Sequence, residues 1–317
     1  MSRSSAALVA YDLRPVKQTE RRIIVDLLRT ARGSGIDVTP YTYIGMGGPR
    51  FYDFEMLHKY LGIRSMISLE QDTQMIQRCK FNKPFGFIRL LSKDAAEFID
   101  EYEFNRPVVI WLDYDWGLSR IIKSDIFALA AKLPMHSFLF VTIRAELPGP
   151  RAHTPVEAKI EFLREELGEL ALPCGPSDVG RDGYPKYVER VLTATFKSAF
   201  SGAAFGTFFP LLRVLYRDTT WMATVGGVLS DRRIGNKLLR NARFEFPFLF
   251  PTQDGPFELA DLNFTSRERV LLDHAVTCKS ERKIDTKKLR KLGFDQEQVD
   301  VYRNVVRFMP KYVETFM

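Results

Sequence analysis

Residues 41–48 read Tyr-Thr-Tyr-Ile-Gly-Met-Gly-Gly, a short run of strand-forming residues that ends in a glycine turn. β-Branched and aromatic residues favour strands, whereas glycine tolerates backbone conformations closed to other residues. We therefore predict a strand that passes directly into a tight turn. A helix over residues 51–61, ended by Gly62, is expected next. This strand, turn and helix are the first unit of a repeating pattern.

The alternation of strand and helix continues to residue 143, with five strands in about a hundred residues. The further strands are expected at 65–69, 87–91, 107–112 and 137–143, and the helices at 73–82, 95–102 and 118–133. These strands are continuous apolar runs, as expected where both faces of a sheet are covered. The pattern predicts an α/β fold, with helices on both faces of a parallel sheet.

Further elements precede and follow these five strands. A helix is expected at 16–31, and the strands 208–216 and 221–228 are expected to form an antiparallel hairpin. The sheet domain is therefore predicted to cover residues 1–229. A smaller, basic and mostly helical unit is predicted at 230–317.

The segment 149–206 breaks the regular alternation. It is rich in proline and glycine, with a charged helix expected at 156–170 and a helix or strand near 186–195. Loops after the late strands of such sheets carry specificity, so we predict that this segment is a lid or insertion near the site.

The composition excludes several classes of protein. The chain has 317 residues, 45% of them hydrophobic, which is enough for a sizeable core. The longest apolar stretch, 126–143, is interrupted by Lys132 and Pro134, so no membrane span is expected. No apolar secretion signal follows the N-terminus. The three widely spaced cysteines suit a reducing cytoplasm and predict neither disulfides nor a zinc site.

The formal net charge is +7, from 46 basic and 39 acidic side chains. Much of the excess lies in two runs, residues 232–243 and 279–291. Such runs either bind phosphate backbones or are solvated faces, and both interpretations stay open. Nucleic acid is therefore one candidate partner.

Acidic residues follow the second, third and fourth predicted strands, where ligands of open α/β sheets bind. Glu70 can accept hydrogen bonds from two ribose hydroxyls, or it is a solvated strand end. Asp94 either meets an adenine amino group or caps the next helix. Asp113 and Asp115 are two residues apart, so their side chains point to one face of the strand. Burial of an unpaired carboxylate is costly, which favours a role in a site over a role in packing. With the glycine turn, these acids predict a nucleoside with a charged tail as the ligand.

Five motifs in the first half of the chain are fairly specific. They are Arg14-Pro-Val-Lys-Gln-Thr-Glu-Arg-Arg22, Tyr43-Ile-Gly-Met-Gly-Gly48, Asp53-Phe54, Phe81-Asn-Lys-Pro84 and Trp111-Leu-Asp-Tyr-Asp115. They resemble a bacterial group of putative O-methyltransferases within the class I S-adenosylmethionine-dependent methyltransferases. The resemblance implies a Rossmann-like seven-stranded methyltransferase sheet whose sixth and seventh strands are the antiparallel hairpin. It also implies S-adenosylmethionine as cofactor and a cytoplasmic enzyme.

The resemblance further implies roles for single residues. The cofactor would contact Gly45, Met46, Gly47 and Gly48 with its methionine part, Glu70 with its ribose and Asp94 near its adenine, and Asp113 and Asp115 would face the methyl group. Methyl transfer is an in-line displacement that needs a base when the acceptor is a hydroxyl. We assign this role to Asp115 first and Asp113 second, with a small molecule, nucleotide or nucleic acid as acceptor.

Two departures from the family pattern affect the function. Tyr43 begins the motif Tyr-Ile-Gly-Met-Gly where an acid is usual, which leaves two alternatives open. One is a catalytically inactive methyltransferase-like protein that binds a nucleotide or nucleic acid as a sensor or partner module; the other is a nucleic-acid-binding protein with the sheet as scaffold. Residues 142–146 lack the Asp-Asn of catechol-type O-methyltransferases, so no metal is predicted. Residues 113–116 also differ from the Asn/Asp-Pro-Pro-Tyr of DNA amino-methyltransferases, which argues against base N-methylation.

Other polar residues are weaker candidates. His136 and His153 either serve as the base or are structural residues. The N-terminal segment has four more polar candidates, Tyr11, Arg14, Lys17 and Arg21. Their side chains either reach over the cofactor or lie on a solvated helix face, and we favour the solvated face.

Overall fold

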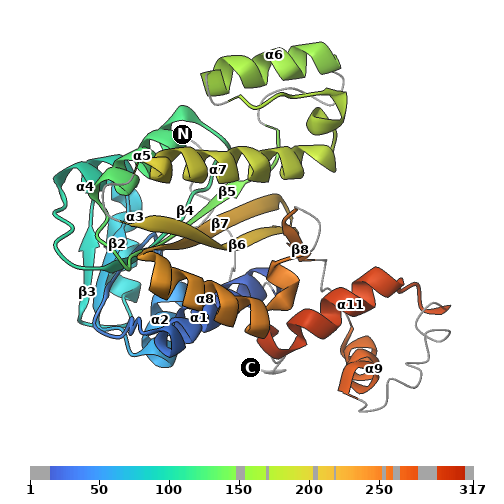
Figure 1. The fold of residues 1–317 in the computed structure, drawn as a ribbon, viewed down its shortest axis with the longest axis horizontal. Coiled ribbons are helices and arrows are strands. Elements are labelled where there is room, and N and C mark those ends of the chain that lie inside the picture. Colours follow the sequence, from blue (N-terminus) through green and yellow to red (C-terminus); the bar gives the residue numbers. More distant parts are fainter. Residues whose placement is uncertain are drawn as a thin grey trace.

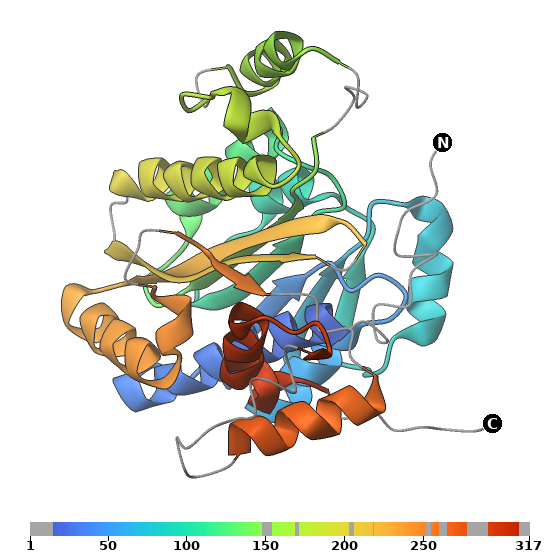
Figure 2. The same cartoon turned by 90° about the vertical axis from the view of Figure 1, so that its right-hand side faces the viewer.

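The computed structural model describes residues 15–147, 154–168, 171–202, 206–217, 219–251, 255–259, 265–277 and 291–310. Its centre is an eight-stranded sheet with helices on both faces (Figures 1 and 2). The strands are β1 (Thr42–Gly45), β2 (Ser65–Leu69), β3 (Ile88–Leu91), β4 (Val108–Asp113), β5 (Phe138–Arg144), β6 (Thr207–Arg217), β7 (Trp221–Ser230) and β8 (Phe257–Leu259).

The strand order across the sheet is β3-β2-β1-β4-β5-β7-β6-β8. Strands β1 to β5 are parallel, and β7 is antiparallel to both β5 and β6. The order reverses at β1, which has β2 on one side and β4 on the other. Open α/β sheets bind their ligands at such a switch point, beyond the carboxyl ends of the strands.

Helices cover both faces of the sheet. They are α1 (Pro15–Ser34), α2 (Tyr52–Leu61), α3 (Thr73–Asn82), α4 (Ala95–Glu101), α5 (Arg120–Lys132), α6 (Val156–Leu167), α7 (Gly183–Ser201), α8 (Arg232–Glu245), α9 (Ser266–Thr277) and α11 (Gln296–Val305). Successive strand residues point to opposite faces, so Tyr43 packs with α1, α2 and α8, whereas Ile44 packs with α4, α5 and α7. Two buried apolar clusters result, one on each face.

The predicted fold class is confirmed: a parallel α/β sheet that ends in an antiparallel hairpin. The predicted number of strands was one too few, because β8 adds an eighth strand parallel to β6. This strand has three residues and lies in a proline-rich stretch, too short for a recognisable pattern. The segment near 186–195 is helical, as part of α7.

The described part of the predicted C-terminal unit shares its core with the sheet. Helix α8 packs against α1 and β6, and Gly235 lies directly against the ring of Phe209. Tyr302 and Val305 of α11 are buried in the same cluster as Tyr43. A domain boundary at residue 230 stays a prediction. No helix in the described ranges is long and apolar enough to cross a membrane.

Candidate active site

A cavity of about 780 Å³ lies at the carboxyl ends of β1, β2, β3 and β4. This volume is typical of small-molecule sites. Its wall comes mainly from the segments at the ends of these four strands, with the first turns of α1, α2 and α5 and the end of β5. The lining residues are Met46–Arg50, Tyr52, Asp53, Leu69–Asp72, Lys93–Ala96, Asp113–Trp116, Ile121, Asp125, Arg144, Lys17 and Arg21. No described residue of the segment 149–206 lines it, and the lid role of that segment stays a prediction.

The glycine turn brings the backbone to the cavity. A Cβ atom on Gly47 would lie 2.7 Å from the Phe51 ring and 2.9 Å from the Phe54 ring, so no side chain fits there. Gly48 has a φ of 51°, which favours glycine. Gly47 and Gly48 line the cavity, as does Met46. Gly45 does not; it lies under the turn, where a Cβ would overlap the Tyr43 hydroxyl.

The predicted acids lie around this cavity. Glu70 accepts a hydrogen bond from the backbone N–H of Asp72 at 2.9 Å, and burial raises its pKa. Asp94 lines the cavity and also caps α4, accepting from the Glu97 N–H at 2.8 Å. Asp113 and Asp115 both line the cavity; Asp113 is half-buried and Asp115 is exposed.

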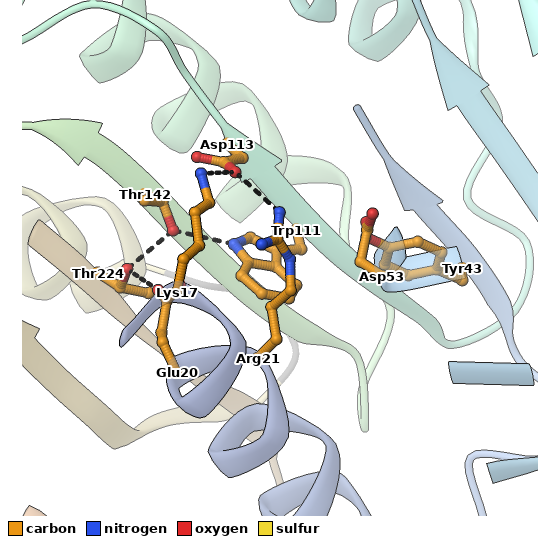
Figure 3. Close-up of polar contacts among 9 residues, drawn as sticks. All are labelled: Lys17, Glu20, Arg21, Tyr43, Asp53, Trp111, Asp113, Thr142 and Thr224. Atoms are coloured by element: carbon orange, nitrogen blue, oxygen red, sulfur yellow. Dashed lines mark hydrogen bonds and ion pairs between the residues drawn. The ribbon is translucent and has the colours of Figure 1, made fainter. Parts of the chain in front are cut away.

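Two cations of α1 face these acids. The Nζ atom of Lys17 lies 2.8 Å from the Oδ2 atom of Asp113, and Nη2 of Arg21 lies 3.8 Å from the same oxygen (Figure 3). Lys17 is 5% exposed and Arg21 is 6% exposed. The preferred interpretation of a solvated helix face was therefore wrong for both residues. The first turns of α1 lie over the end of β4, and the acid there compensates the cost of burying them.

Arg21 lines the cavity and is held in place by its neighbours. Its Nε and Nη1 atoms are buried without a hydrogen-bond partner in the described part of the chain. The guanidinium lies 5.5 Å from the centre of the Tyr52 ring and 5.9 Å from that of Trp111. Although burial opposes its charge, the carboxylates of Asp53 and Asp113 raise the pKa of Arg21. The cavity wall thus includes a buried cation that is held between aromatic rings and beside Asp113.

Asp53 adds a carboxylate beside the glycine turn. It accepts a hydrogen bond from the Tyr43 hydroxyl, and burial raises the pKa of both side chains. Asp53 lines the cavity. A carboxylate therefore lies at this turn, although Tyr43 stands where the first motif usually has an acid.

A buried chain of hydrogen bonds joins α1 to the sheet behind the cavity (Figure 3). The indole N–H of Trp111 donates to Thr142 Oγ1 at 2.9 Å, and the hydroxyls of Thr142 and Thr224 lie 2.8 Å apart. The Thr224 hydroxyl then donates to Glu20. Burial raises the pKa of Glu20 to about 7, against the opposing effect of Lys17. This chain fixes the helix that carries Lys17 and Arg21.

Other candidates lie elsewhere. His136 has its Nδ1 atom 3.1 Å from the Ser230 hydroxyl and is not among the cavity-lining residues. His153, Tyr11 and Arg14 lie outside the described residues. Within the described ranges, no group of three or more His, Cys, Asp or Glu side chains could hold a metal ion.

Several solved structures align with part of this chain. The alignment with a putative O-methyltransferase from Klebsiella pneumoniae has a TM-score of 0.41 and 12% identity, over 71% of this chain and 84% of that chain. The alignment with N-methyltransferase NodS from Bradyrhizobium japonicum WM9, solved with S-adenosyl-L-homocysteine, has a TM-score of 0.40 and 12% identity. It covers 69% of this chain and 90% of that chain. The alignment with spermidine synthase from Thermotoga maritima has a TM-score of 0.41 and 10% identity, over 66% of this chain and 60% of that chain.

A protein-family model supplies the assignment. Comparison with curated proteins gives no match. The model described as "Putative O-methyltransferase" matches residues 9–317, almost the entire length. It includes all the motifs that indicated this family, as well as the α1 cations that line the cavity. The chain therefore belongs to the putative O-methyltransferase family.

Proposed function

We propose that the protein transfers a methyl group from S-adenosylmethionine to a hydroxyl oxygen of a small molecule or nucleotide. The observation that carries this proposal is the cavity at the switch point of the sheet, where a glycine turn, strand-end acids and a buried arginine meet. The cofactor would supply an activated methyl group on a sulfonium. Its ribose hydroxyls, adenine and amino-acid group each need a different partner, and the cavity wall offers one for each.

The cavity residues divide into matching roles. Glu70 at the end of β2 would accept from the ribose hydroxyls, and Asp94 would lie near the adenine while it caps α4. The backbone at Gly47 and Gly48 would border the methionine part. Arg21 would attract the methionine carboxylate, because its guanidinium lines the cavity and is a buried positive charge.

The two aspartates after β4 would act on the acceptor. Asp113 is held by Lys17 at 2.8 Å, so we assign it a positioning role. Asp115 is exposed at the cavity wall, where an acceptor hydroxyl can reach it from solvent. Asp115 would take the hydroxyl proton as the oxygen attacks the methyl carbon in line with the departing sulfur. Positioning of the two reactants supplies most of the remaining rate enhancement.

Calorimetry with two ligands tests the cofactor assignment. S-adenosylhomocysteine has the amino-acid carboxylate, whereas 5′-methylthioadenosine lacks it. We expect Arg21→Met to weaken S-adenosylhomocysteine binding by about 10- to 100-fold, the loss of a charge-assisted hydrogen-bond pair. Binding of 5′-methylthioadenosine should stay unchanged. Arg22→Met is the matched control, because Arg22 lies over the Tyr60 ring instead of in the cavity.

The outcomes separate the two parts of the assignment. No binding of S-adenosylhomocysteine to the wild-type protein at high concentration would refute the cofactor. Equal losses for both ligands in Arg21→Met would refute only the carboxylate role of Arg21.

Transfer of radiolabelled methyl groups to a cell extract tests the chemistry. Asp115→Asn should lose labelling while it retains S-adenosylhomocysteine binding. Labelling at the wild-type rate would refute Asp115 as the base. If the wild-type protein binds the cofactor but labels no extract, the inactive binding protein becomes the better interpretation.

A further inference from the structure

The outer face of α8 is a row of cations. Arg232, Arg233, Lys237, Arg240 and Arg243 are all exposed, and they recur at the spacing of one helix face. None of the five lies within 4.0 Å of a carboxylate oxygen of the described residues. Four of the five are arginines, whose planar fork binds phosphate oxygens in pairs.

The opposite face of α8 is fixed to the protein (Figures 1 and 2). Gly235 lies against the Phe209 ring of β6. Asn241 donates to the Ser34 hydroxyl of α1 at 2.9 Å, and Thr30 donates to Glu245 at 2.9 Å. Because its apolar side is buried in this way, α8 cannot insert that side into a bilayer, and only the charged side faces outward.

An exposed aromatic ring ends the row. Phe244 follows Arg243 and is 88% exposed, whereas phenylalanine is usually buried. A flat ring beside a phosphate-binding row suits an unpaired base, since stacking needs a free base face. A base-paired duplex offers no such face along its length.

We propose that the outer face of α8 binds single-stranded nucleic acid, with the five cations on the phosphates and Phe244 stacked on a base. The inference does not depend on the proposed methyl transfer. The cavity contacts the first turns of α1, through Lys17 and Arg21, whereas α8 contacts its last turns, at Thr30 and Ser34.

Fluorescence anisotropy with a labelled 20-nucleotide oligouridine tests this surface on the full chain. We expect Lys237→Glu/Arg240→Glu to weaken binding at least tenfold, and Phe244→Ala to weaken it several-fold. With five phosphate contacts on a single strand, affinity should fall about a hundredfold between 50 and 200 mM salt. The matched control is Arg181→Glu/Lys197→Glu, which makes the same charge change at two exposed positions outside α8 and should bind normally.

Thermal unfolding of each variant establishes that it is folded. Equal affinity of the α8 variant and the wild type would overturn the proposal, since any binding would then lie elsewhere. Binding to phosphatidylserine vesicles without binding to oligouridine would also overturn it, in favour of an anionic lipid surface. Loss of oligouridine binding in the α8 variant alone supports it.

Discussion

Replacing Glu20 by glutamine should change how the stability of the protein depends on pH. Glu20 is 1% exposed; one carboxyl oxygen accepts from Thr224, and the other has no hydrogen-bond partner in the described chain. Burial raises the pKa of this carboxyl from its ordinary value of 4.5 to about 7. The folded protein therefore holds a proton that the unfolded chain releases at lower pH.

The sign of the effect follows from this difference. A raised pKa contributes stability that is fully present below pH 4.5 and is lost as the pH rises toward 7. At about 1.36 kcal/mol for each pH unit, the full contribution is about 3 kcal/mol. Most of the loss falls between pH 5 and 7. Glutamine cannot ionise, so Glu20→Gln should lack this part of the pH dependence.

Urea unfolding at pH 5, 6, 7 and 8 measures the difference between the two proteins. The free energy of unfolding of the wild type, minus that of Glu20→Gln, should fall by about 2.5 kcal/mol as pH rises through this range, and the rest of the change lies below pH 5. The glutamine amide leaves a buried donor unpaired, which lowers stability equally at every pH and does not alter this slope. Glu165→Gln, at an exposed position of α6, is the control and should follow the wild type.

Parallel curves for Glu20→Gln and the wild type would refute this reasoning. They would mean that Glu20 ionises in the folded protein as it does in water. The cations and the Thr224 hydroxyl beside Glu20 would then offset the effect of burial in full.

Two further predictions concern packing and thiol chemistry. Gly235→Ala places a Cβ atom into the Phe209 ring and should lower stability by about 1–3 kcal/mol in thermal unfolding. Gly86→Ala, with open space around it, should change little, and equal effects of the two changes would contradict the packing. Burial, with the Glu70 carboxylate, raises the pKa of Cys79 from 9.0 to about 12, which reduces its thiolate about a thousandfold at pH 8. With Cys79 as the sole cysteine, iodoacetamide should label the folded protein at least that much more slowly than the unfolded one, and similar rates would disprove the burial.

The sheet could be predicted from the sequence because its signals are local. The parallel strands are short, mainly apolar runs followed by turns, and β2 and α3 begin and end at the predicted residues. The strand β8 could not be predicted, since three residues carry no periodicity and its pairing with β6 is a long-range contact. The type of α7 stayed open because tyrosine, valine and threonine, common in its sequence, also suit strands.

The candidate site was predictable only where it follows the strands. Glu70, Asp94, Asp113 and Asp115 were singled out because strand ends meet at one edge of a sheet, and all four line the cavity. The α1 cations were assigned to solvent because lysine and arginine are rarely buried. Their partner, Asp113, lies almost a hundred residues away, and no local pattern predicts that contact. The available clue was the spacing of Lys17 and Arg21, one helical turn apart on a single face.

The attachment of α1 has a consequence for the order in which the protein matures. Its anchors come late in the chain: Thr224, Asn241 and Glu245 lie 204 to 215 residues beyond the α1 residues they hold. At ribosomal speeds of about 5–20 residues per second, α1 waits on the order of 10–40 s for these anchors to be made. The five parallel strands can pair before then, but the cationic wall of the cavity cannot be fixed. Ligand recognition should therefore be among the last properties that a newly made chain acquires.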